Sequence, residues 1–225
     1  MSRTALVLCG GRGTRFRNVS TNPKILAPFR NGKFIDWVIS FLNKNGFEKI
    51  ILSLGYKSEE IIAYTSIHFK SYNLDYFIED TPLGTGGAVI NAFKTFKGEE
   101  LCVFNGDTFW SNNLSKEFLQ KPINIGLCLT KNLPENDRYG DFNIENKRII
   151  IKKGSSEKIL YNSNVFIGIA RISRNISTEG LSNPYSFEDL LLSQKHGIAV
   201  SKFEGQMFDF GTPEAYRAFG AIHGI

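Results

Sequence analysis

The sequence contains little cysteine and little histidine, with three residues of each among 225. Cys9, Cys102 and Cys128 stand far apart, and each lies in an apolar run rather than at a metal-binding or redox spacing. We therefore expect reduced cysteines that pack in the core. Because the histidines do not pair at ligand spacing either, no zinc site is predicted. Any bound metal is expected to be a hard cation held by carboxylates.

Long hydrophobic runs are also absent. No stretch approaches the roughly 20 apolar residues that a transmembrane helix needs. The first apolar run, at residues 5–9, is too short for the core of a signal peptide and is followed by a glycine loop. These absences predict a cytoplasmic protein with no membrane partner.

Positive charge is in modest excess, because 27 Lys and Arg residues face 22 Asp and Glu residues, which leaves +5. This balance suits an anionic small ligand as well as a nucleic acid. No basic run is longer than Lys152-Lys153, so the sequence does not favour nucleic-acid binding. The 21 glycines and 7 prolines exclude a collagen-like chain, and the 13% of aromatic residues excludes a mainly disordered one.

Apolar runs and helical patterns alternate over the first half of the chain. The apolar runs predict buried strands at residues 4–9, 49–54, 75–78 and 101–105. Helical spacing predicts helices at residues 34–45, 58–68 and 86–96, with Ser58 as the N-cap of the second. Such alternation is typical of βαβ units and a parallel sheet.

The second half contains more strands and fewer helices. Its patterns predict strands at residues 125–130, 142–144, 148–152, 165–172, 198–203 and 207–210, and helices at residues 186–194 and 212–222. The last helix opens with the N-cap and first-turn residues Thr212, Pro213 and Glu214. The predicted fold is one α/β domain over residues 1–225, with a Rossmann-like mixed, mainly parallel sheet flanked by helices and a small β-rich part.

A glycine loop, Gly10-Gly11-Arg12-Gly13-Thr14-Arg15, directly follows the first predicted strand. Glycines there allow backbone N–H groups to turn toward an anion and form a phosphate cradle. A dinucleotide fingerprint is excluded because Phe16 stands where its third glycine is needed, and the end of a P-loop is absent. The alternative is a tight turn with solvated arginines.

Lys24 and a second glycine cluster are further candidates. Pro23 restricts the backbone just before Lys24, which is either a phosphate ligand or a surface lysine. The cluster at residues 82–87 lies between a predicted strand and a helix. Its glycines permit either the approach of a flat ligand such as a base or close packing of the chain.

Two carboxylates are candidate metal ligands. Asp107 follows a predicted strand, and ligands of open α/β sheets bind at the carboxyl edge of the strands. Asp209 lies between Phe208 and Phe210, where a charge is costly to bury unless it is paired with a cation. Both residues suit Mg²⁺, although Asp209 could equally be a capping or loop carboxylate.

Taken together, these segments resemble the sugar-1-phosphate nucleotidyltransferases. The family pattern is Gly-x-Gly-Thr-Arg, Pro-Lys, Leu-Gly-Thr-x-Gly, Gly-Asp and Asp-x-Gly-Thr-Pro. The chain carries these motifs in order at residues 11–15, 23–24, 83–87, 106–107 and 209–213. The resemblance implies a fold of the nucleotide-diphospho-sugar transferase type. It also implies that residues 1 to about 110 bind the nucleotide and about 111 to 225 bind the sugar phosphate.

The resemblance also implies roles for individual residues. It makes Arg15, Lys24 and Asp107 catalytic and makes Asp107 and Asp209 the ligands of Mg²⁺. It implies nucleotide contacts from Leu8, Gly10, Gly11, Gly13, Thr14, Arg15, Gly84, Thr85 and Gly106. It implies sugar phosphate contacts from Tyr139, Gly140, Glu157 and Lys158. The implied partners are an NTP and a sugar 1-phosphate, with the enzyme acting as a monomer or homodimer.

Within the family, residues 8–11, 83–88, 105–109, 137–140 and 186–188 are similar to the D-glycero-D-manno-heptose 1-phosphate guanylyltransferases. This similarity implies GTP and a heptose 1-phosphate as substrates, for capsule or lipopolysaccharide synthesis. Two positions depart from the wider family. Ile25 replaces the second proline of Pro-Lys-Pro, and Phe166 stands where many members have the asparagine of Asn-x-Gly near the sugar.

Other functions remain open at this point. Uridylyl- or cytidylyltransferases that act on another sugar 1-phosphate, such as N-acetylmuramate 1-phosphate, share parts of the pattern. A non-catalytic nucleotide-sugar sensor would keep the fold without turnover. An NAD(P)-dependent oxidoreductase is disfavoured by Phe16, and a nucleic-acid-binding protein is disfavoured by the scattered basic residues.

Overall fold

The computed structural model describes residues 3–11, 13, 22–120, 125–130, 142–145, 148–151, 164–194 and 198–223. Its strands are β1 (Thr4–Leu8), β2 (Pro28–Phe29), β3 (Gly32–Lys33), β4 (Lys49–Leu54), β5 (Leu74–Ile78), β6 (Glu100–Asn105), β7 (Thr108–Trp110), β8 (Ile125–Thr130), β9 (Phe142–Glu145), β10 (Arg148–Ile151), β11 (Val165–Ser173), β12 (Ala199–Lys202) and β13 (Met207–Asp209). Its helices are η2 (Lys24–Leu26, a 3-10 turn), α1 (Phe34–Lys44), α2 (Ser58–His68), α3 (Gly84–Thr95), α4 (Lys116–Gln120), α5 (Phe187–Leu192) and α6 (Pro213–His223).

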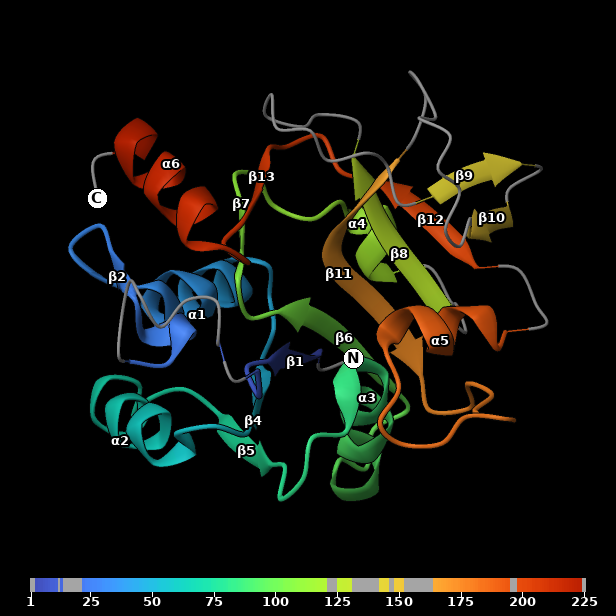
Figure 1. Ribbon diagram of the computed structural model, residues 1–225, viewed down its shortest axis with the longest axis horizontal. Helices are drawn as coiled ribbons and strands as arrows, with labels where there is room; N and C mark the ends of the chain where they lie inside the picture. Colours follow the sequence, from blue (N-terminus) through green and yellow to red (C-terminus); the bar gives the residue numbers. More distant parts are fainter. Residues whose placement is uncertain are drawn as a thin grey trace. The chain divides into compact units, whose positions relative to one another are not determined.

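A seven-stranded sheet has the order β12-β8-β11-β6-β1-β4-β5 (Figure 1). The pairs β1–β4, β4–β5 and β8–β12 are parallel, whereas β8–β11 is antiparallel. The predicted mixed, mainly parallel sheet with flanking helices is therefore confirmed. Because β1, β4 and β5 run the same way, their carboxyl ends lie at one edge of the sheet, which is where such folds bind ligands.

The chain divides into two compact units. The first unit comprises Met1–Leu83, Phe104–Phe109 and Phe208–Ile225, and the second comprises Gly84–Val103 and Trp110–Met207. Each unit is assembled from segments that are distant in sequence. The assignment of nucleotide binding to one sequence half and sugar binding to the other stays a prediction.

An aromatic cluster fills the core of the first unit. It consists of Phe29, Phe34, Trp37, Phe109, Phe208, Phe210 and Phe219, from α1, α6 and the short strands between them. Phe29 and Phe219 are stacked with their ring centroids 5.5 Å apart, and both are buried. Interlocked rings in close-packed cores have little freedom to move. The cluster therefore gives the neighbouring loops a rigid support.

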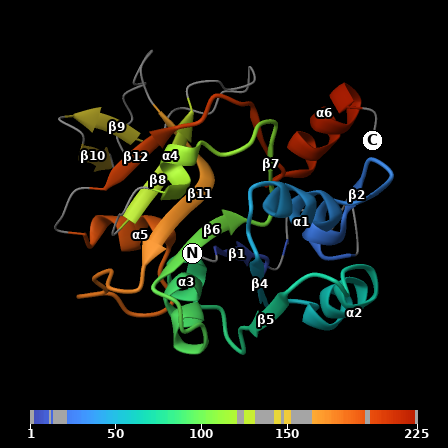
Figure 2. The same cartoon turned by 180° about the vertical axis from the view of Figure 1, so that it is seen from behind.

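The core of the second unit includes paired polar groups. Arg171 is 6% exposed, and its Nε and Nη2 donate to the two carboxylate oxygens of Glu100 over 2.8 and 2.6 Å. Such a two-point pairing satisfies a charge that would be costly to bury alone. Helices α3 and α5 lie side by side in this unit, as Figures 1 and 2 show.

The structure confirms the longer predicted elements. The helix predicted at residues 34–45 is α1, which buries its apolar face and is followed by Gly46 with a φ of +76°. The predicted cap of α6 is also present, since the Thr212 hydroxyl accepts from Ala215 N over 3.2 Å. Cys102 and Cys128 are reduced and buried, as expected, whereas Cys9, also reduced, is only half-buried as a whole residue.

One capping prediction is wrong. Lys57, in the left-handed region at a φ of +58°, is the N-cap of α2, and Ser58 is its first helical residue. Ser58 N donates to Gly55 O over 3.2 Å, so a tight turn after β4 already brings Ser58 into the helix. The short elements η2, β2, β3 and β7 were not predicted, because two or three residues are too few to show a period.

Candidate functional site

The glycine loop begins at the carboxyl end of β1. Cys9 N donates to Ser53 O over 2.8 Å, which extends the pairing with β4 by one residue. Gly106 N donates to Leu8 O over 3.0 Å, and a Cβ on Gly106 would lie 2.5 Å from that oxygen. A side chain at residue 106 would therefore push the segment that carries it away from the end of β1. Gly13 has a φ of +54°, a conformation that favours glycine.

Lys24 and Asp107 meet in the first unit. The Lys24 Nζ lies 2.6 Å from Asp107 Oδ2, and the two side chains are 17% and 33% exposed. Lys24 opens η2, in which Leu26 N donates to Pro23 O over 2.8 Å. Ile25, the departure from the family motif, is buried in the core at 3% exposure. A partly exposed ammonium and carboxylate thus lie beside the glycine loop, where they could bind a phosphate and a cation.

Asp209 is held next to Asp107 through the backbone. Phe210 N donates to Asp107 O over 2.8 Å, and Asp209 Oδ1 accepts from Gly211 N over 2.6 Å. Phe210 is buried in the aromatic cluster, while Asp209 is only half-buried. Asp209 is the last residue of β13, so the ring of the next residue anchors the carboxylate from outside the strand.

This donor set fits Mg²⁺. The ion prefers oxygen ligands, and proteins usually hold it with one or two carboxylates while waters and substrate phosphates complete the shell. Among the residues that the structure describes, no group of three or more His, Cys, Asp or Glu residues could hold a metal. Asp107 and Asp209 therefore suit an ion whose other ligands are substrate phosphates and waters, rather than a cation site built entirely by the protein.

Cys9 lies beside this pair but does not supply a nucleophile. Burial, and secondly the negative charge of Asp107, raise the pKa of the Cys9 thiol above its ordinary value. The thiol therefore stays protonated near neutral pH, and the thiolate is the nucleophilic form of cysteine. Cys9 Sγ would lie 3.1 Å from a Cβ on Gly106, so the thiol is part of the packing around the loop.

The second glycine cluster has a packing reason of its own. Gly84 has a φ of +74°, and a Cβ there would collide with the Tyr185 carbonyl. Gly86 N donates to Tyr185 O over 3.1 Å, and Phe187 N donates to the Thr85 hydroxyl over 2.8 Å. These contacts join the start of α3 to the start of α5 within the second unit. Nucleotide contacts from Gly84 and Thr85 stay a prediction.

Several predicted residues lie outside the described parts of the chain. These are Arg12, Thr14 and Arg15 of the glycine loop and Tyr139, Gly140, Glu157 and Lys158 of the predicted sugar phosphate site. Phe166, the other departure, is described. Its half-buried ring is stacked on that of Phe187, with centroids 5.6 Å apart and an interplanar angle of 9°.

Glu79 is a candidate that the sequence patterns did not single out. It follows β5, and its Oε1 accepts from the buried Ser53 hydroxyl over 2.9 Å, while Oε2 accepts from Leu83 N over 3.2 Å. A Cβ on Gly10 would lie 3.0 Å from Oε1, so the carboxylate abuts the glycine loop. The signal that could have revealed Glu79 is the one used for Asp107, a carboxylate just past the end of a parallel strand.

Comparison with known proteins places the chain in a family. Residues 4–153 match the model of the nucleotidyl transferase family. The chain is 34% identical to D-glycero-alpha-D-manno-heptose 1-phosphate guanylyltransferase of Campylobacter jejuni, over 96% of this chain and 97% of the relative. It is 35% identical to the protein of the same name from Aneurinibacillus thermoaerophilus, over 95% of each chain.

Solved structures agree with the sequence comparisons. HddC from Yersinia pseudotuberculosis has a TM-score of 0.79 and 28% identity, over 96% of this chain and 97% of that chain. A second structure of HddC, complexed with GMP-PN, matches equally well. No helix among the described residues is long and apolar enough to cross a membrane. The chain belongs to the nucleotidyl transferase family, and within it to the sugar-1-phosphate nucleotidyltransferases.

Proposed function

We propose that this enzyme transfers a guanylyl group from GTP to D-glycero-D-manno-heptose 1-phosphate, giving GDP-heptose and pyrophosphate for surface polysaccharide synthesis. The observation that carries the proposal is the Lys24–Asp107 ion pair beside the glycine loop. The names of the relatives from Campylobacter jejuni and Aneurinibacillus thermoaerophilus support the choice of base and sugar.

The reaction needs neutralisation of charge rather than a covalent intermediate. A phosphate oxygen of the sugar phosphate attacks the α-phosphorus of the NTP, and the bond from that phosphorus to the bridging oxygen of pyrophosphate breaks. Two phosphate charges about 4 Å apart repel each other by roughly 4 kcal/mol at an effective dielectric near 20. Fixed positive groups and exact alignment of the two phosphates are therefore the main requirements.

Lys24 supplies one positive group. Its ammonium is held by Asp107, and it lies where it can contact the α-phosphate or the incoming sugar phosphate. The backbone N–H groups of the glycine loop are suited to the remaining phosphates. Arg15 retains the role that the family resemblance implies for it, which is to stabilise the departing pyrophosphate.

Asp107 and Asp209 would hold Mg²⁺. Bound there, the ion would offset the negative charge of the triphosphate. The backbone hydrogen bond from Phe210 N to Asp107 O keeps the segments that carry the two carboxylates next to each other. Asp107 would thus pair with the ammonium of Lys24 and, with Asp209, hold the cation.

Glu79 supports guanine as the base. Guanine presents two adjacent donors, N1–H and the 2-amino group, to which a carboxylate is complementary, whereas uracil presents a single N–H flanked by carbonyls. The Glu79 oxygens each accept one hydrogen bond from the protein, and each carboxylate oxygen can accept a second. We therefore expect Glu79 to contribute to the preference for GTP.

A substrate grid tests the proposal. GTP, ITP, CTP, UTP, dTTP and ATP are each combined with heptose 1-phosphate, mannose 1-phosphate, N-acetylmuramate 1-phosphate and glucose 1-phosphate, and magnesium-dependent release of pyrophosphate is measured. GTP with heptose 1-phosphate should have the highest kcat/KM. Equal or higher activity of CTP or UTP with another sugar would overturn the substrates but not the family. No turnover of any pair would favour the non-catalytic sensor.

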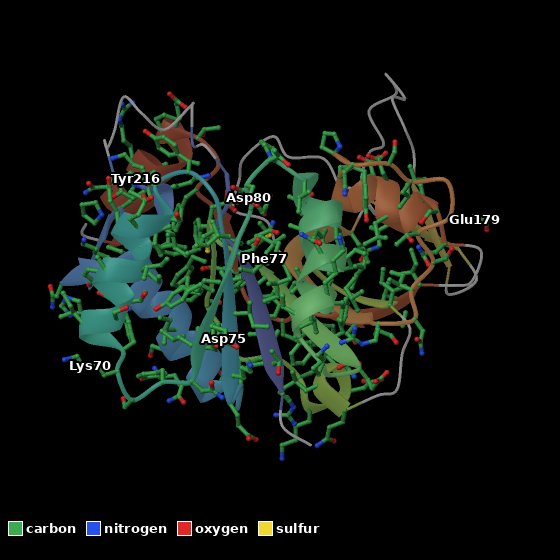
Figure 3. All side chains as sticks on the ribbon, turned by 90° about the horizontal axis from the view of Figure 1, so that it is seen from below. Lys70, Asp75, Phe77, Asp80, Glu179 and Tyr216 are labelled. Carbon is green, nitrogen blue, oxygen red and sulfur yellow. The ribbon has the colours of Figure 1, made fainter. Side chains whose placement is uncertain are left out.

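Replacement of Glu79 tests the base preference. Glu79→Gln should lower kcat/KM for GTP by about tenfold relative to UTP, because an amide offers one acceptor instead of two. Asp80→Asn is the matched control, since Asp80 is the next residue and is exposed (Figure 3). An unchanged ratio of GTP to UTP activity in Glu79→Gln would remove Glu79 from base recognition.

A further inference from the structure

Helix α6 is joined to the Lys24–Asp107 ion pair by a series of contacts within the first unit. Tyr216, labelled in Figure 3, lies one turn into α6, where its N–H donates to Thr212 O over 3.1 Å. Its hydroxyl donates to the backbone oxygen of Pro28 over 2.6 Å. This hydrogen bond spans 188 positions of the sequence and attaches α6 to the segment that follows η2.

The segment from Pro28 back to Lys24 is short and braced. Ala27 N donates to Lys24 O over 3.0 Å, and Phe34 N donates to Ala27 O over 3.0 Å. Ile25 and Leu26 are both 3% exposed and anchor η2 in the core. Because so few residues separate Pro28 from Lys24, a shift of the Pro28 carbonyl is transmitted to the backbone of Lys24.

The segment that leads into α6 also contacts Asp107, the other partner of the ion pair. Asp107 O accepts from Phe210 N over 2.8 Å, and the Phe210 ring is edge-on to the Tyr216 ring with centroids 6.0 Å apart. Residues 209–216 therefore supply Asp209, the hydrogen bond to Asp107 and the hydroxyl that holds Pro28. One continuous segment therefore contacts Asp107 directly and contacts the segment that carries Lys24 through Pro28.

We propose that Tyr216 is a positioning residue that sets the Lys24 ammonium against the reacting phosphates. The inference rests on the proposed function, in which Lys24 neutralises a phosphate. Lysine is a flexible side chain with a point charge, so the precision of its placement depends on the backbone beneath it. A small displacement lowers the stabilisation of the transition state more than it lowers substrate binding.

The surroundings of the hydroxyl indicate that its role is positional. Burial raises the pKa of Tyr216, so the hydroxyl keeps its proton and stays a donor well above neutral pH. Pro28 is exposed, so water can take the place of the lost donor, and little stability should be lost without the hydroxyl.

A double-mutant cycle tests the proposal, using the NTP and sugar 1-phosphate with the highest kcat/KM in the grid. The variants are Tyr216→Phe, Lys24→Ala and their combination. Tyr64→Phe is the control, because it removes another tyrosine hydroxyl of the first unit, one that donates to Asp36 over 3.0 Å. For each protein kcat, the KM for the NTP and the thermal midpoint are measured.

Tyr216→Phe should lower kcat about fivefold to tenfold and leave the KM for the NTP within about twofold. Its midpoint should stay within about 2 °C of the parent, and Tyr64→Phe should keep the parent kcat. Lys24→Ala should lower kcat by orders of magnitude, and adding Tyr216→Phe to it should change kcat no further. A purely structural role predicts instead that the two effects multiply.

Three results would overturn the inference, and they are distinguishable. If Lys24→Ala is slow but Tyr216→Phe keeps the parent kcat, or if the two effects multiply, Tyr216 does not act through Lys24 and the proposed function stands. If Lys24→Ala keeps the parent kcat, the proposed role of Lys24 fails, and this inference fails with it.

Discussion

At the scale of single residues, the site depends on a few polar side chains in a mainly apolar surrounding. The Lys24–Asp107 ion pair is partly exposed, so its contribution to stability is small, and in the proposed function the pair acts on the phosphates instead. Cys9 lies nearby but is kept protonated by burial and by Asp107. Among the described residues, Lys24, Asp107, Asp209 and Glu79 carry the charge at this edge of the sheet.

Asp107→Asn should abolish most turnover and leave the fold intact. The amide lacks the charge that holds the Lys24 ammonium and that would hold the proposed cation, so we expect kcat to fall at least about 100-fold. Pyrophosphate release and circular dichroism measure the two effects. Asp75→Asn is the control, since Asp75 forms an ion pair with Lys49 at a surface position that is 54% exposed. A folded Asp107→Asn enzyme with a near-parental rate would refute the metal assignment.

At the scale of elements, the glycines at the start of α3 determine how closely it packs against the segment that leads into α5. Gly84 and Gly86 leave no room for a Cβ beside Tyr185, and Thr85 caps the first turn of α5 by accepting from Phe187 N. The sequence left open whether this cluster serves a ligand or packing, and the packing is now evident. Nucleotide binding at the same residues stays a prediction.

Gly84→Ala should destabilise the protein more than Gly180→Ala does. Both glycines have a positive φ, +74° and +78°, but only the Cβ at Gly84 meets other atoms. The control isolates the backbone strain, which costs about 1 kcal/mol, and the steric collision with Tyr185 should add roughly 1–3 kcal/mol. Thermal or urea unfolding measures both variants. If both variants lose the same free energy of unfolding, the start of α3 can move away from Tyr185 without destabilising the protein.

At the scale of the whole molecule, the strand order explains how the site is assembled. Parallel strands β1, β4 and β5 end at one edge, which brings the glycine loop, Ser53 and Glu79 together. The aromatic cluster then supports the chains that carry Asp107 and Asp209. Buried titratable groups distributed over the molecule also make its stability depend on pH.

Stability should fall as the pH rises above about 9. Burial raises the pKa of Cys128 to about 12 from an ordinary 9.0, and it raises that of Cys9 as well. Between the unfolded and folded pKa values the unfolded chain has lost a proton that the folded chain retains, so increasing pH favours unfolding. Each such thiol should contribute a slope of about 1.4 kcal/mol per pH unit, or roughly 2–4 °C in the thermal midpoint.

The measurement is the thermal midpoint of the parent and of Cys128→Ala between pH 7 and pH 11. The variant should be less stable at neutral pH, because it leaves a small cavity, but its midpoint should decline less steeply above about pH 9. Parallel declines in the two proteins would show that Cys128 does not retain its proton on folding.

By itself the sequence determined the alternation of strands and helices, the mixed sheet, the order of the motifs and, through them, the family. These are properties of consecutive residues, because periodicity and turn chemistry are local. Only the tertiary structure decided that Lys24 meets Asp107, 83 positions away, that Glu79 abuts Gly10, and that Tyr216 holds Pro28. Such contacts follow from which strand ends and loops the sheet brings to one edge, and no local pattern encodes that order.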